Sequence, residues 1–202
     1  MSLPADHFSF SQYALYCRSP AEYFKRYVVG VEEPPTLPMI LGKICHQAIE
    51  KPRLKWKAEL IASGFTPNYA TGIEKAVAAL PKTGMREKKL EAPFPKFLHD
   101  GKPVKLIGYA DGYHPNLIHE WKTGRAWNQQ RVDESEQLTM YALIHRLTTG
   151  DIPKFVLAHI NLPNGKVTLF QTKRTVRQIE QFRKEKLEPV MQLINRGVFH
   201  RI

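Results

Sequence analysis

Apolar residues recur every three to four positions through the first eighty residues, a period that predicts amphipathic helices. The spacing predicts one helix from about residue 10, a second that begins at Ser19 and Pro20, and a third over residues 37–51. Pro52 should interrupt the third helix, with a charged helix resuming to Ser63 and a short helix over residues 68–80. The first part of the chain is therefore expected to be mainly helical.

From about residue 86 the apolar positions alternate, which is typical of strands. Strands are predicted over residues 88–97, 104–114 and 116–124, and a strand pair over residues 154–162 and 166–174 flanks a turn at residues 163–165. Residues 81–89 are expected to form a basic loop, and residues 133–150 and 175–197 to form helices. This order indicates an α/β fold with a central mixed β-sheet flanked by helices and an N-terminal helical portion.

One domain is expected to contain the whole chain, residues 1–202. That length is enough for one hydrophobic core, and no shift in composition marks a boundary. Residues 1–80 would form the helical part, residues 86–172 the sheet with the helix that carries Gln137 and Tyr141, and residues 175–196 the closing helix.

The charge of the chain favours a polyanionic partner. Thirty basic and 19 acidic residues give a net charge of +11, which suits nucleic acid before a membrane surface, with general solubility as the alternative. No apolar run approaches the ~20 residues that a membrane span needs, and the first residues lack the pattern of a signal peptide. Two cysteines, Cys17 and Cys45, are too few for a disulfide framework and favour a reducing, cytoplasmic setting.

The stretch "GYADGYHPNLIHEWKTG", residues 108–124, places charged residues among apolar and aromatic ones. Residues two apart in a strand point to the same side, so Glu120 and Lys122 project together and Trp121 points away. The turn at residues 115–116 lets Asp111 approach the same side. Two carboxylates and an ammonium group suit a divalent cation and metal-assisted hydrolysis of a phosphodiester. A surface hairpin with a salt bridge is the alternative.

The pattern E-x-K occurs twice, as "EKK" at residues 87–89 and as "EWK" at residues 120–122. The first lies in a charged run and is interpreted as a solvated strand edge. The second follows an apolar pair and comes nine residues after Asp111. Position along the chain therefore selects the second triplet as the candidate site.

Two other features matter only in combination with this triplet. Gln137 and Tyr141 are four apart on a predicted helix and share a face that could look back at the sheet. His46, in "GKICHQAIE", could ligate a metal through its imidazole. Taken alone, a partly buried polar pair and a structural histidine are the simpler interpretations.

Taken in order, four short motifs resemble the RecB-like branch of the PD-(D/E)XK nuclease superfamily, which includes CRISPR-associated members. The motifs are G-x-x-x-H at residues 42–46, G-x-x-D at 108–111, E-x-K at 120–122 and Q-x-x-x-Y at 137–141. The serine and aromatic residues of the opening helices are similar too, so the resemblance covers roughly residues 8–145. It implies a restriction-endonuclease-like core and a deoxyribonuclease that depends on Mg²⁺ or Mn²⁺, an exonuclease in preference to an endonuclease.

The resemblance also implies roles for particular residues. His46, Asp111 and Glu120 would bind the metal with help from the Trp121 backbone carbonyl, and Lys122 would be the catalytic lysine. Residues that would shape the site or contact DNA are Gln137, Tyr141 and, as a further acid on the first predicted strand, Glu91.

Beyond the motifs, Arg125 follows the E-x-K strand and is a candidate contact to DNA phosphates. Many relatives carry four cysteines for an iron–sulfur cluster, and two cysteines cannot build one, so no such cluster is expected here. The alternatives are a DNA-binding subunit with a nuclease fold, working with a recombination, replication or helicase partner, and a regulatory protein that acts on other proteins. Polarity, strand preference and oligomeric state stay open.

Overall fold

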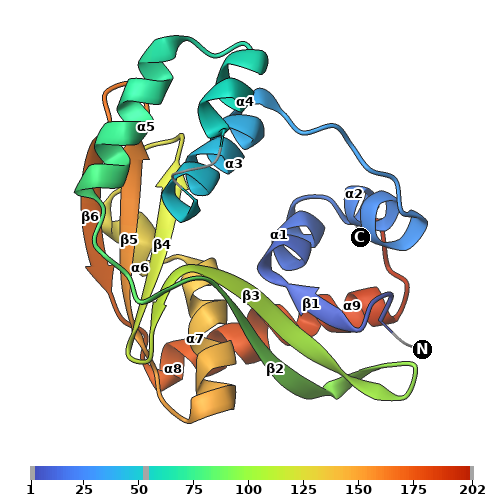
Figure 1. The fold of residues 1–202 in the computed structure, drawn as a ribbon. Coiled ribbons are helices and arrows are strands. Elements are labelled where there is room, and N and C mark those ends of the chain that lie inside the picture. Colours follow the sequence, from blue (N-terminus) through green and yellow to red (C-terminus); the bar gives the residue numbers. More distant parts are fainter. Residues whose placement is uncertain (1–2, 52–54, 201–202) are drawn as a thin grey trace.

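The computed structural model describes residues 3–51 and 55–200, arranged as shown in Figure 1. The predicted interruption at Pro52 lies outside these residues. In the part of the chain that is described, no helix has the length and apolar character needed to cross a membrane.

The helical elements are α1 (Phe10–Arg18), α2 (Pro20–Tyr23), η1 (Phe24–Val29), α3 (Leu37–Glu50), α4 (Trp56–Ala62), α5 (Pro67–Ala79), α6 (Gln129–Asp133), α7 (Glu136–Thr149), α8 (Val176–Phe182), η2 (Arg183–Leu187) and α9 (Glu188–Asn195). The strands are β1 (His7–Ser9), β2 (Met85–His99), β3 (Lys102–His114), β4 (Leu117–Thr123), β5 (Lys154–Asn161) and β6 (Lys166–Thr172).

The strands form one mixed sheet in the order β1-β3-β4-β5-β6, with β2 pairing along the other edge of β3. The β2–β3, β3–β4 and β5–β6 pairs are antiparallel, whereas β1–β3 and β4–β5 are parallel. Figure 1 shows α3, α4 and α5 on one side of the β4–β6 strands and α6 and α7 on the other. The α/β fold with a mixed sheet flanked by helices is therefore confirmed.

Two hydrophobic cores form on the two faces of this sheet. The larger core packs α7, α8 and α9 against β2 and β3 and includes the aromatic residues of α1 and α2. The smaller core packs α3, α4 and α5 against β4 and β5 and includes the side chain of Trp121. Successive side chains of a strand point to opposite faces of the sheet, so neighbouring residues of β5 enter different cores. Leu157 belongs to the larger core and Ala158 to the smaller.

Local sequence sets several element boundaries as expected. Ser9 caps α1 in a capping box with Gln12, which satisfies free backbone N–H groups at the start of the helix. Ser19 caps α2, and Pro20 occupies its first turn. Gly150 ends α7 in the left-handed conformation that glycine adopts at low cost.

Residues 81–89 were expected to be a basic loop, and this expectation is wrong for its second half. The strand β2 begins at Met85, and Met85, Arg86 and Lys88 pair with residues of β3. Pairing with a neighbouring strand decides this segment, because its side chains lack the apolar alternation on which the sequence prediction relies. The short strand β1 and the separate helix α6 were also not predicted.

Candidate active site

The candidate site lies at the point along β3 where the neighbouring strand on one edge changes from β1 to β4. Along one edge, β1 pairs with Lys105–Ile107 and β4 pairs with Gly112–His114, so residues 108–111 fall between the two ladders. At residues 108–111, side chains form hydrogen bonds in the place of those that a neighbouring strand would form. Asp111 Oδ2 accepts a hydrogen bond from the Trp121 backbone N–H at 2.6 Å, and the Tyr141 hydroxyl donates to the Tyr109 carbonyl at 2.8 Å. Polar side chains enter the sheet here because buried backbone groups need partners.

Glu120 and Lys122 project from β4 to the same side, next to α7. The Lys122 ammonium donates to Glu120 Oε1 at 2.6 Å, and the Gln137 amide donates to the same oxygen at 2.8 Å. Gln137 also lies 2.9 Å from the Tyr141 hydroxyl, so one helix face holds both residues against the strand. The structure thus brings together the E-x-K and Q-x-x-x-Y motifs.

Burial and mutual attraction oppose each other in the Glu120–Lys122 pair. Glu120 is only 4% exposed, and burial raises the pKa of its carboxyl to about 7 although Lys122 acts in the opposite direction. Burial acts to lower the pKa of Lys122, but the charge and hydrogen bond of Glu120 and the charge of Asp111 together outweigh it, and the pKa lies above its ordinary value. Lys122 therefore keeps its positive charge at neutral pH.

Next to this pair, His46 of α3 meets Asp111 of β3. His46 Nδ1 lies 3.0 Å from Asp111 Oδ1. Burial acts to lower the pKa of His46, and the hydrogen bond and charge of Asp111 more than compensate, so the pKa is raised. Ligand atoms of His46, Asp111 and Glu87 all lie within 4.8 Å of one another, a spacing that one metal ion can bridge.

Sequence reasoning missed Glu87, which was read as part of a solvated edge. It sits opposite Asp111, between the strand pairs Arg86↔Gly112 and Lys88↔Ala110. Its φ of 48° is in the left-handed region, where a residue other than glycine is strained. The register of β2 on β3 is the same on both sides of Glu87, so the unusual backbone is confined to this residue. The only signal in the sequence was the first E-x-K triplet itself.

The structure does not bring Glu91 into this group. Glu91 forms ion pairs on the surface with Lys89 at 2.6 Å and with Lys105 at 3.9 Å. It lies four residues beyond Glu87, roughly 13 Å along a strand. Glu87, and not Glu91, is the acid that β2 contributes near the site.

The residues of the site offer donors of the kind that a divalent cation takes, although in the described structure Glu120 lies outside the group that His46, Glu87 and Asp111 form. Glu120 Oε2 is buried and has no hydrogen-bond partner among the described residues. A buried carboxylate oxygen without a partner costs free energy, and a bound cation would remove that cost. Carboxylate oxygens, a backbone carbonyl and an imidazole are ligands suited to Mg²⁺ or Mn²⁺.

The two motif glycines, Gly42 and Gly108, differ in whether a larger residue would fit in their place. A Cβ atom at Gly108 would lie 2.5 Å from the Tyr141 ring, so only glycine lets α7 approach β3 this closely. A Cβ atom at Gly42 would lie 3.4 Å from Thr123 Oγ1, an ordinary contact. Gly108 therefore positions Tyr141, whereas Gly42 has no comparable steric role.

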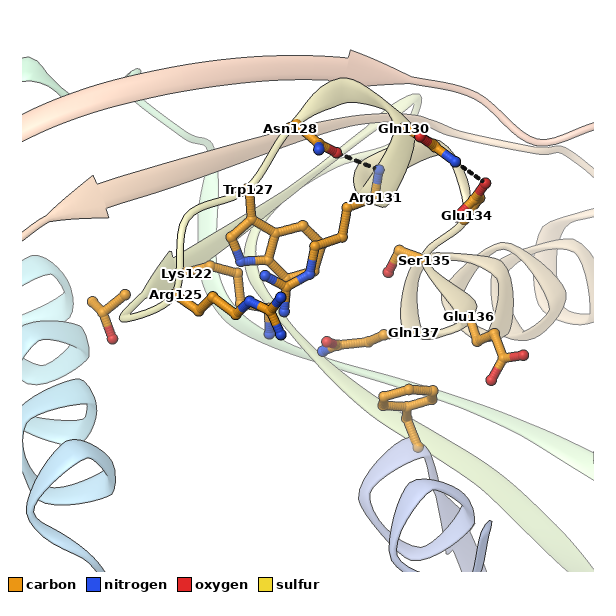
Figure 2. Close-up of a pocket in the computed structure, with 12 residues that line it drawn as sticks. Lys122, Arg125, Trp127, Asn128, Gln130, Arg131, Glu134, Ser135, Glu136 and Gln137 are labelled. Carbon is orange, nitrogen blue, oxygen red and sulfur yellow. Dashed lines mark hydrogen bonds between the residues drawn. The ribbon is translucent and has the colours of Figure 1, made fainter. Parts of the chain in front are cut away.

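A cavity of about 690 Å³ opens beside Lys122 and Gln137. Figure 2 shows side chains from the loop after β4 and from α6 pointing into it, among them Arg125, Trp127 and Arg131. The wall formed by α6 and α7 is held in place by Arg174, which is buried and donates to the carbonyls of Val132 and Ser135. Arg125 thus lies in the cavity beside the candidate site.

The family model of the PD-(D/E)XK nuclease superfamily matches residues 7–199. The chain belongs to the PD-(D/E)XK nuclease superfamily. This membership makes the site described above a candidate nuclease centre, and superfamily members use divalent metals. No protein in the curated set matches the sequence.

A solved structure shares the fold at low sequence identity. A protein from Eubacterium rectale, described as a candidate exonuclease, is 14% identical with a TM-score of 0.66, over 96% of this chain and 83% of that one. The protein SSO0001 is 15% identical with a TM-score of 0.35, over 89% of this chain and 88% of that one. The first of these likenesses supports the PD-(D/E)XK nuclease fold.

Proposed function

We propose that this PD-(D/E)XK protein is a metal-dependent DNA nuclease that hydrolyses phosphodiester bonds, as an exonuclease acting at DNA ends. The observation that carries the proposal is the buried Glu120 carboxylate. One of its oxygens is held by Lys122 and Gln137, and the other has no hydrogen-bond partner among the described residues, beside the Asp111 and His46 pair. A purely structural ion pair has no need of the second, unpaired oxygen.

The metal ligands in this proposal are His46, Asp111, Glu120 and the Trp121 carbonyl, with Glu87 added from the geometry of the described residues. A bound Mg²⁺ or Mn²⁺ would polarise the scissile phosphate and lower the pKa of a coordinated water. Asp111 is oriented for this task, because the Trp121 N–H and His46 each hold one of its oxygens.

Lys122 would stabilise the negative charge that develops on the phosphate and would orient the attacking water. The Lys122 side chain is only partly buried; its ammonium group donates to Glu120, and the side chain lines the cavity. Gln137 and Tyr141 would position Glu120 and the strand β4.

The net charge of +11 and the two arginines, Arg125 and Arg131, that line the cavity beside Lys122 support DNA as substrate. The Eubacterium rectale protein with this fold is described as a candidate exonuclease, which is consistent with action at ends. An endonuclease and a non-cleaving DNA-binding subunit of a larger complex are the alternatives.

The test is an end-labelled cleavage assay on linear single-stranded, linear duplex and circular DNA with Mg²⁺, Mn²⁺ or EDTA. We expect linear DNA to be degraded only with metal, circles to be spared, and Glu120→Gln to be inactive. Cleavage of circles would identify an endonuclease. Retained binding that depends on salt, without cleavage in either metal, would identify a binding subunit.

A further inference from the structure

Two arginines in the cavity beside Lys122 have no part in the mechanism proposed above. Arg125 and Arg131 are exposed and line this cavity, and Figure 2 shows both side chains directed into it. In residues 3–51 and 55–200, the arginines that pair with carboxylates lie elsewhere, at Arg18, Arg146 and Arg183. The cavity therefore holds two guanidinium charges that lack an acidic partner within the described structure.

Arg131 is held in position without a carboxylate. Its guanidinium carbon lies 3.9 Å from the centre of the Trp127 ring, and Nη1 donates to the Ala126 carbonyl at 3.0 Å. Trp127 in turn packs against the larger core. A guanidinium group has five N–H donors, so most of them stay available for a ligand. Because the side chain is already ordered, binding an anion there costs less conformational entropy.

The arginines of the cavity suit a phosphate monoester better than a phosphodiester. Lys122 pairs with Glu120 at 2.6 Å. Of the two acids that also line the cavity, Glu136 pairs with Lys186 at 2.6 Å and Glu134 accepts a hydrogen bond from Gln130 at 3.0 Å, so Arg125 and Arg131 are the basic groups left to meet an incoming anion. A phosphodiester inside a DNA strand carries one negative charge, whereas a phosphate monoester carries about −1.5 to −2 at pH 7. Guanidinium groups also bind phosphate oxygens in pairs, which suits the three free oxygens of a monoester.

We propose that the cavity formed by Arg125, Trp127 and Arg131 binds the terminal phosphate monoester of a DNA strand. Its volume of about 690 Å³ is large enough for a nucleotide-sized group. The inference rests on the proposed function, because it seats the strand end beside Lys122 and the metal ligands. It also assigns Trp127 to holding Arg131 and not to stacking on a base, since the guanidinium covers its ring.

The test measures binding without catalysis. Fluorescence anisotropy in EDTA compares three single-stranded oligonucleotides of one sequence, with a 5′-phosphate, with a 3′-phosphate, or with hydroxyl groups at both ends. We expect one phosphorylated end to bind about tenfold more tightly than the hydroxyl-ended strand, the ratio that one added charge-assisted hydrogen bond supplies. Whichever end shows the preference identifies the strand polarity.

The ratio of affinities is then measured in variants whose folding is checked by thermal melting. Arg125→Ala and Arg131→Ala should bring the ratio close to one, and Arg131→Lys should restore it only in part, because lysine lacks the planar fork. Arg196→Ala is the matched control, an exposed arginine after α9 outside the cavity, and should keep the ratio. Equal binding of all three strands, or a preference that survives both alanine substitutions, would overturn the proposal. Loss of metal-dependent cleavage with the ratio intact would instead overturn only the nuclease function.

Discussion

The two E-x-K triplets of this chain have the same residue types and different surroundings. Glu120 is buried, shares one oxygen with Lys122 and Gln137, and leaves the other without a hydrogen-bond partner in the described structure. In the first triplet, Glu87 is exposed and turns toward His46 and Asp111, while Lys89 pairs with Glu91 on the surface. The comparison teaches that a lysine becomes a candidate catalytic group through burial beside a carboxylate and not through spacing alone.

The largest expected difference between the triplets is in catalysis. Lys122→Ala should reduce the rate of metal-dependent DNA cleavage on the order of 10²-fold or more, because it removes a charge aimed at the phosphate. Its affinity for DNA in EDTA should stay close to that of the wild type. Lys89→Ala is the matched control from the first triplet and should cleave normally. Equal loss of cleavage and binding in Lys122→Ala would contradict the role.

A second difference concerns pH. The pKa of Glu120 is about 7 in the folded protein against an ordinary value of 4.5. Between these values the folded state binds more protons than the unfolded state, so the free energy of unfolding falls as pH rises. We expect the metal-free protein to lose on the order of 1–3 kcal/mol between pH 5 and 8, measured by urea unfolding in EDTA.

In the Glu120→Gln variant this decline should be smaller. Glu91→Gln should retain it, because the lysines that surround Glu91 lower its pKa. A decline of the same size in Glu120→Gln and the wild type would place the titrating group elsewhere.

The smallest effect should distinguish Glu87 from Glu91 as the acid of β2. Glu87→Gln should weaken Mn²⁺ binding about tenfold in isothermal titration calorimetry, since it removes one of several ligands or their immediate neighbour. Glu91→Gln should bind Mn²⁺ as the wild type does, because Glu91 lies on the surface with Lys89. Weaker Mn²⁺ binding in Glu91→Gln, with normal binding in Glu87→Gln, would instead support Glu91, the acid that was chosen from the sequence.

Much of the fold could be predicted because its periodicities are strong. The helices around His46 and Gln137 and the strands around Asp111 and Glu120 lie where the apolar pattern placed them. The start of β2 was missed, since Met85 and Arg86 enter the sheet through pairing with β3 and without an apolar face of their own. Short local segments such as β1 depend on the same kind of distant pairing.

The sequence by itself determined the order of the motifs, the α/β class and the family resemblance, because these depend on local spacing and periodicity. Only the tertiary structure decided which acids meet. The gap between the β1 and β4 ladders turns Asp111 toward Trp121 and His46, and the pairing of β2 with β3 brings Glu87 to them. Such contacts join residues far apart in the chain, and their formation depends on backbone hydrogen bonds that no single segment contains.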